Sequence, residues 1–296
     1  MKLKKIFLIL AALVAFSSAL TAVSDYEYLL GKYKIIKETE EEKLLKTQQE
    51  EKVKRESAEI MKNAEYLEVL NTYLVVIPGK DYLMMRTEVT QKQWQIIMGN
   101  NPSNFEGDDL PVENVSWIDA VVFCNKLSEK EGLKPCYSYK GNSNVEEWKF
   151  LKEELSNWTD KKWKKFNESL VCDSNANGYR LPTVEEWQYA ARGGQNYKYS
   201  GSDKLYEVGW YSGNSGKKTH LVALKTPNGY GLHDMSGNVW EWCWDSYPNN
   251  SGKRYNCGGG WFNDAYYCGV GDMVWSDAYR VGKYLGFRIV RSSSKK

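Results

Sequence analysis

The chain has 296 residues, of which 42% are hydrophobic and 26% charged, the composition of a globular protein with one large or two small domains. The formal charge of +2 is the difference between 40 basic and 38 acidic residues, and the basic residues form no concentrated stripe along the sequence. Nucleic acid is therefore not expected as a partner. With only 2 histidines, His220 and His233, a multi-histidine metal centre is excluded as well.

Residues 1–22 have the three parts of a secretory signal peptide: lysines, an apolar run over residues 6–16, and small residues before the cleavage region. The apolar run is shorter than the ~20 residues that span a bilayer. We therefore expect an exported protein, in the periplasm, on the cell surface or secreted. An uncleaved membrane anchor is the alternative.

Residues 23–72 are predicted to form a charged helical stalk, because residues 37–62 are rich in basic and acidic side chains and contain neither proline nor glycine. Val53, Ile60 and Leu67 are spaced as in a heptad repeat, but the positions between them are mostly polar. A solvated helix is therefore favoured over an oligomerising coiled coil.

A folded domain is predicted over residues 73–291, followed by a tail at 292–296. Thr90 and Gly99 bound one expected helix, and Ser116 and Gly132 bound another. A charged insertion at 141–170 has the pattern of amphipathic helices, and a further helix begins at Pro182–Thr183 and ends at Gly193. Short strands separated by Gly, Asn and Pro dominate after position 195, so the fold class is α+β.

The 6 cysteines allow up to three disulfides in an exported protein. Cys136 and Cys172 flank the insertion, where a bridge would staple its base, and free thiols are the alternative. Cys124 lies in an apolar helical pattern, which favours a free buried thiol.

Four motifs in order, TEVTQKQW with PVENVSWIDAVVFCNKLS, GYRLPTVEEWQYAARGG, NGYGLHDMSGNVWEWCWD, and GGGWFND with LGFRIVR, resemble the formylglycine-generating enzyme, or sulfatase-modifying factor, family. The resemblance covers about residues 73–291. It implies an irregular variant of the C-type lectin fold, here with an N-terminal helical segment.

The motif DMSGNVWEW carries two carboxylates around a glycine-containing turn, the mixture of carboxylate and carbonyl oxygens that calcium prefers. The resemblance implies a calcium site from the side chains of Asp234 and Glu241 with the carbonyls of Gly237 and Val239. The alternative is a carboxylate pair satisfied by backbone amides and arginine. A second calcium site of the family has no acidic loop to hold it in this chain.

Catalytic members of the family hold copper between two cysteines and oxidise a sulfatase cysteine to formylglycine. Cu(I) prefers sulfur ligands. The matching positions in this chain are Asn263 and Cys268, so one of the two cysteines is absent. The resemblance therefore implies that copper is not bound, and Cys268 is the catalytic candidate only if the enzyme alternative holds.

The stretch from Gly260 to Arg280 resembles the mutated region of the variable proteins of diversity-generating retroelements, which present a ligand-binding surface on a lectin-like scaffold. GGGW and GFRIVR frame it, and most of its residues are types reachable from an asparagine codon by changing adenines, with Met273 and Trp275 as exceptions. Aromatic side chains mixed with Asp, Ser and Gly are typical of binding loops. The ligand-binding residues predicted from this resemblance are Phe262, Asp264, Tyr266, Tyr267, Asp272, Met273, Trp275, Asp277 and Tyr279.

We expect Tyr266, Tyr267, Trp275 and Tyr279 to be exposed, and Trp261, Tyr284 and Phe287 to fill the core. The sequence thus favours a non-catalytic, exported protein that binds a protein or glycan ligand at a surface. The alternatives are a copper-dependent formylglycine-generating oxidase, a non-catalytic helper of another enzyme, or a structural envelope protein.

Overall fold

The computed structural model describes residues 64–248 and 252–293, together with Glu40, Lys43, Leu44, Thr47 and Lys62. The predicted signal peptide and most of the predicted stalk lie outside the described residues. The chain divides into two compact units, Met1–Glu59 and Ile60–Lys296, and the second contains the domain. None of the helices in the described part has the length and hydrophobicity of a membrane span.

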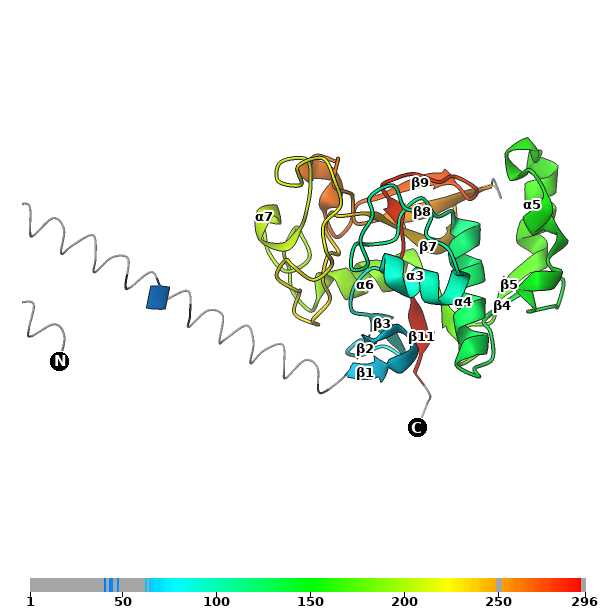
Figure 1. Cartoon of the computed structure of the whole chain (residues 1–296), viewed down its shortest axis with the longest axis horizontal. Coiled ribbons are helices and arrows are strands. Elements are labelled where there is room, and N and C mark those ends of the chain that lie inside the picture. Colours follow the sequence, from blue (N-terminus) through cyan, green and yellow to red (C-terminus); the bar gives the residue numbers. More distant parts are fainter. Residues whose placement is uncertain are drawn as a thin grey trace, which may run out of the picture. The chain divides into compact units, whose positions relative to one another are not determined.

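The second unit is a mixed helix and sheet fold with short strands and long loops, as predicted for the α+β class (Figure 1). Its helices are α3 (Gln91–Met98), α4 (Trp117–Lys130), α5 (Asp160–Ser169), α6 (Val184–Arg192) and α7 (Leu205–Val208). Its strands are β1 (Ala64–Leu67), β2 (Thr72–Val76), β3 (Tyr82–Met85), β4 (Tyr137–Tyr139), β5 (Leu170–Cys172), β6 (Tyr179–Arg180), β7 (Trp240–Ser246), β8 (Lys253–Cys257), β9 (Met273–Asp277), β10 (Leu285–Gly286) and β11 (Val290–Ser292).

A five-stranded sheet has the order β1-β2-β3-β11-β6, so the last strand of the chain lies between β3 and β6. This sheet begins at Ala64, upstream of Tyr73, because β1 pairs with β2 in an antiparallel hairpin. The predicted boundary between stalk and domain is therefore too late. In Figure 1, β11 in red lies against the blue strands from the start of the domain.

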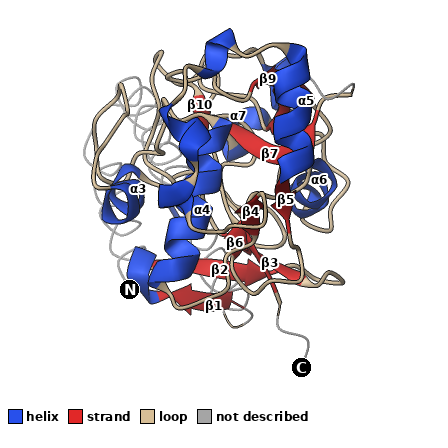
Figure 2. Ribbon diagram, turned by 90° about the vertical axis from the view of Figure 1, so that its right-hand side faces the viewer, coloured by secondary structure: helices blue, strands red, loops and turns tan. Residues whose placement is uncertain are grey.

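A second sheet of four strands has the order β10-β7-β8-β9, with β10 parallel to β7 and the other neighbours antiparallel. Figure 2 shows α4 between this sheet and the five-stranded one. The indole Nε1 of Trp117 in α4 donates to Cys243 O at 2.9 Å, and that of Trp242 in β7 donates to Val115 O at 3.0 Å. The largest core cluster therefore joins α4 to the four-stranded sheet.

Three helices begin where the sequence predicts, at Thr90, Ser116 and Thr183. Each of these side chains caps its helix in a reciprocal capping box with the residue three positions later. Gly99 and Gly193 end the first and third helices in the left-handed conformation. These helix ends are fixed by hydrogen bonds between near neighbours in the sequence.

The insertion predicted at 141–170 consists of three short 3-10 helices, Val145–Glu147, Lys149–Lys152 and Leu155–Asn157, followed by α5. β4 and β5 form a two-stranded sheet at its base, and Tyr137, not Cys136, lies opposite Cys172. All six cysteines, each of them a described residue, are free thiols. The predicted Cys136–Cys172 bridge is absent, while Cys124 is a buried free thiol as expected.

Candidate functional site

The aromatic stretch leaves β8 at Cys257, crosses the glycines of the GGGW frame, forms the short 3-10 helix η5 (Ala265–Cys268), and returns as β9 along β8. Among the described strands, β9 pairs only with β8 and is the edge strand of its sheet. In Figure 1, β9 is the uppermost labelled strand of the domain. The stretch therefore runs along one edge of the four-stranded sheet.

Of the four rings expected to be exposed, three are exposed and Tyr279 is not, because Trp163 of the insertion stacks on it. Tyr266 is 71% exposed, Trp275 45% and Tyr267 43%, while Tyr279 is half-buried. We define the display surface as the six exposed members of the predicted set, which are Phe262, Asp264, Tyr266, Tyr267, Met273 and Trp275. The other members, Asp272, Asp277 and Tyr279, are half-buried.

The core aromatics also lie where they were expected. Trp261 and Phe287 are buried, and Tyr284 is half-buried and packs against the main core cluster. The Trp261 indole donates to Lys283 O at 2.9 Å. Tyr284 and Trp261 support the start of the display surface, because Phe262 packs on them with ring centroids 4.9 Å and 5.5 Å apart.

Asn263 has a structural role at the start of the display surface. Its Oδ1 accepts from Trp240 Nε1 at 2.8 Å and from Gly260 N at 3.1 Å, and its backbone carbonyl accepts from Ser212 N at 3.0 Å. Ser212 also donates from Oγ to Asp264. The Asn263 amide therefore stabilises the turn at the start of the display surface.

Cys268 is buried and packs with Tyr199, Leu205 and Val208. Burial raises the pKa of its thiol to about 12, so the thiol is protonated at neutral pH. A protonated thiol is a poor nucleophile and a poor metal ligand. The two matching positions therefore present an amide and a protonated thiol.

Gly259 lies in the GGGW motif and tests how closely the chain packs there. Its φ is +75°, and a Cβ there would lie 2.6 Å from Cys268 Sγ and 2.8 Å from Tyr267 O. We expect Gly259→Ala to lower the free energy of unfolding by about 2–4 kcal/mol through backbone strain and overpacking. Gly271→Ala, which has open space around its Cβ position, is the control and should change it by less than about 0.5 kcal/mol. Equal effects in urea denaturation would contradict the tight frame.

The β9 half of the surface is supported from two sides. Lys253 Nζ lies 3.6 Å from the ring centroid of Trp275, and Tyr247 packs on the same indole at 5.3 Å. From the insertion, Trp163 stacks on Tyr279 at 6.2 Å. Sequence reasoning missed Lys253 and Tyr247, since both lie before the framed region and only the β8–β9 pairing brings them to it.

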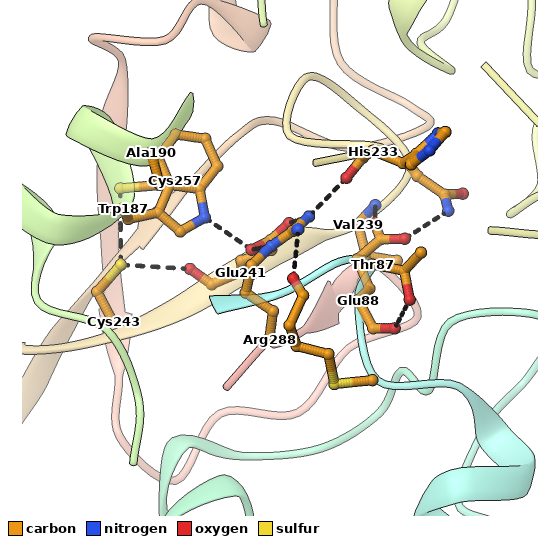
Figure 3. A network of polar contacts seen from close by, with 12 residues as sticks. Thr87, Glu88, Trp187, Ala190, His233, Val239, Glu241, Cys243, Cys257 and Arg288 are labelled. Atoms are coloured by element: carbon orange, nitrogen blue, oxygen red, sulfur yellow. Dashed lines mark hydrogen bonds and ion pairs between the residues drawn. The ribbon is translucent and has the colours of Figure 1, made fainter. Parts of the chain in front are cut away.

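Of the four predicted calcium ligands, Glu241 and Val239 belong to a buried polar network around Arg288 and Glu88 (Figure 3). Glu241 accepts two bonds from Arg288, at 2.6 Å from Nε and 2.7 Å from Nη2, and a third from Trp187 Nε1 at 2.6 Å. The Asp234 carboxylate accepts from Ala223 N at 2.7 Å, and its Oδ1 has no partner. Both carboxylates are buried.

Charge is concentrated in this network. Burial, together with the nearby carboxylates Asp234 and Glu241, raises the pKa of Glu88 well above its usual value, while its oxygens accept from the Asn238 side chain and the Val239 amide. Burial raises the pKa of Asp234 to about 6. Burial and the Arg86 guanidinium lower the pKa of His233 to about 4, so this imidazole is neutral at pH 7.

In this arrangement the Arg288 guanidinium neutralises the Glu241 carboxylate. A carboxylate paired with arginine was the alternative to a calcium site in the sequence analysis. Gly237 lies in a turn with φ +99°, and Val239 is buried. Within the described residues, no group of three or more His, Cys, Asp and Glu side chains is placed to hold a metal ion. The predicted site combines two carboxylates with two backbone carbonyls, and calcium binding there stays a prediction of the sequence. Arg288 lies 47 positions from Glu241, and no local pattern signals their pairing.

Calcium addition tests this arrangement. We expect the same melting temperature in millimolar CaCl₂ and in EDTA, because a ligand that binds only the folded state must stabilise it and Arg288 already neutralises Glu241. Differential scanning fluorimetry of the full chain measures it, with MgCl₂ as the ionic-strength control. An increase of several degrees that is specific to calcium would show that the cation competes with Arg288.

Comparison with known proteins places this geometry in a family. Residues 50–293 match the family described as the sulfatase-modifying factor enzyme 1-like domain. Chaperone protein LppX of Paenibacillus barcinonensis is 39% identical over 236 residues, which are 72% of this chain and 80% of that protein.

Two solved structures share the fold and a substantial part of the sequence. Treponema denticola variable protein 1 has a TM-score of 0.62 and 38% identity, and the match covers 77% of this chain and 90% of that one. CarF has a TM-score of 0.59 and 30% identity, with 76% and 89% covered. The chain therefore belongs to the sulfatase-modifying factor enzyme 1-like domain family.

Proposed function

We propose that the protein is an exported, non-catalytic binding protein that holds a protein or glycan ligand through the display surface. The observation that carries the proposal is the exposure of Tyr266, Tyr267 and Trp275 on a frame that Asn263 and the core aromatics hold rigid. Rigid aromatic side chains give large contact areas at low entropic cost. The similarity to Treponema denticola variable protein 1 supports the same use of the scaffold.

A binding screen with surface variants tests the proposal. The full chain is applied to a glycan array and to a panel of purified surface proteins, beside the double variant Tyr266→Ala/Trp275→Ala. Each lost anchor should weaken binding by on the order of 2 kcal/mol, about 30-fold in Kd, with no change in melting temperature.

Tyr66→Ala is the matched control, because Tyr66 is 48% exposed but lies on β1 in the other sheet. Ligands whose binding is lost only in the double variant support the proposal. If every ligand binds the double variant as well as the wild type, the proposed surface is wrong.

Diversification of residues 258–291 by a template is part of the proposal. A nearly identical, adenine-rich copy of this segment beside a reverse transcriptase gene would support it, and Met273 and Trp275 would then be positions where the template does not carry the asparagine codon. Export is tested by the N-terminal sequence of the mature protein, which should begin after residue 22.

A chaperone role is the second candidate, supported by the 39% identity to chaperone protein LppX. A chaperone would raise the active yield of an exported enzyme encoded beside it, whereas a display protein would leave that yield unchanged. The oxidase alternative has its own test: stoichiometric Cu(I) binding that Cys268→Ser abolishes, together with oxidation of a CxPxR peptide, would overturn the non-catalytic proposal.

A further inference from the structure

Two cysteines of the chain meet in the core, on neighbouring strands of the four-stranded sheet. Cys243 on β7 and Cys257 on the neighbouring strand β8 are fully buried, and their Sγ atoms are 3.7 Å apart. Cys257 lies opposite Glu241 in the antiparallel pairing, so Cys243, two positions farther along β7, lies on the same face of the sheet. Figure 3 shows the two sulfurs facing each other next to Trp187.

The surroundings of the pair disfavour charge. Both sulfurs belong to a core cluster with Val75, Ile77 and Ala190. Burial raises the pKa of the Cys243 thiol well above its usual value, and the carboxylates of Asp245 and Glu241 act in the same direction. Arg288, in the neighbouring polar network, already pairs with Glu241.

These surroundings determine whether the two neighbouring thiols favour metal binding or disulfide formation. Cu(I) held by two thiolates would place a net negative charge beside Glu241 in an apolar core, which is costly. A divalent ion would need further ligands, and no group of three or more His, Cys, Asp and Glu side chains among the described residues could supply them. A disulfide is neutral and apolar, and it adds no charge to this region. The separation of the sulfurs must shorten to about 2.05 Å, which side-chain rotation on adjacent strands can provide.

We propose that Cys243 and Cys257 form a disulfide bond while the chain folds, by exchange with a disulfide oxidant such as oxidised glutathione or a disulfide-form oxidoreductase. One cysteine thiolate attacks a sulfur of the oxidant and releases one reduced thiol. The second cysteine then displaces the other half of the oxidant from the mixed disulfide. The protein loses two electrons and two protons, and the oxidant becomes two thiols.

The exchange precedes the final packing of β7 against β8, because neither sulfur is accessible once the chain has folded. The bond closes the β7–β8 hairpin, and Cys257 immediately precedes the GGGW frame. The bond therefore holds in place the end of β8, where the chain continues into the display surface. The cross-link should favour the folded state by on the order of 100-fold in the unfolding equilibrium constant.

The experiment counts and locates the thiols. The purified full chain is unfolded and reduced, refolded in a mixture of reduced and oxidised glutathione, and then unfolded in N-ethylmaleimide. Trypsin cuts at Lys253 and Arg254, so Cys243 lies in the peptide 226–253, and Cys257 lies with Cys268 in the peptide 255–280. A bridge joins these peptides, and tandem fragmentation separates Cys257 from Cys268.

We expect four alkylated cysteines and a Cys243–Cys257 link, and reduction should yield six alkylated cysteines. Cys124→Ala, a buried thiol in α4, is the control and should keep the link, whereas Cys257→Ala should leave Cys243 alkylated. Six alkylated cysteines after oxidative refolding would refute the proposal, and so would a bridge between any other pair. The result does not depend on ligand binding by the display surface.

Discussion

Replacement of Arg288 by methionine is expected to lower the free energy of unfolding by about 3–5 kcal/mol, because it leaves the Glu241 carboxylate buried without its counter-ion. Both side chains have no exposed surface. Arg288 also donates to His233 O at 2.9 Å and to Met85 O at 3.3 Å, so its loss leaves buried backbone carbonyls unpaired. Urea denaturation followed by tryptophan fluorescence measures the change.

An exposed ion pair supplies the matched control. Lys134 and Asp173 are joined at 2.8 Å, with side chains 70% and 42% exposed. Lys134→Met should have no measurable effect, since solvent screens such pairs. If Arg288→Met lowered the free energy of unfolding as little as Lys134→Met, the buried ion pair would not stabilise the fold as its geometry indicates. The double variant Arg288→Met/Glu241→Gln should recover part of the loss, because the uncompensated charge is then absent.

Trp163→Ala should lower the free energy of unfolding by about 3–5 kcal/mol, as other large-to-small core substitutions do. It should also destabilise β9 locally. Trp163 is buried and lies 4.9 Å from the ring of Trp158 and 6.2 Å from that of Tyr279. Gly252 O accepts from Ala278 N at 2.6 Å, and a Cβ on Gly252 would lie 2.4 Å from the Trp163 ring. The insertion thus packs directly against the β8–β9 half of the display region.

Hydrogen exchange distinguishes this support from general stability. Amides of residues 273–279 should exchange faster in Trp163→Ala under native conditions, while those of the five-stranded sheet should not. Val171→Ala, at a 54% exposed position of β5 in the base of the insertion, is the control and should leave both regions unchanged. Equal protection of residues 273–279 in the wild type and Trp163→Ala would show that the insertion does not hold β9.

The display surface shows which features of the site the sequence pattern could predict. The aromatic, Asp and Gly composition between the two framing motifs predicted exposed rings, and Tyr266, Tyr267 and Trp275 are exposed. Their support could not be predicted in the same way. Trp163 and Lys253 contact this region only because the insertion and β8 pack beside it, and neither is close to it in a sequence motif.

The sequence by itself determined the starts of three helices, the family and the exposure of three of the four rings expected at the surface. Each of these depends on neighbours within a few positions or on a motif read in order, such as the capping boxes at Thr90, Ser116 and Thr183. The tertiary structure decided how the carboxylates are neutralised and which thiols meet, because Arg288 with Glu241 and Cys243 with Cys257 are brought together by strand pairing and core packing. Burial in a low-dielectric core then sets their chemistry, and burial is a property of the whole fold rather than of any local stretch.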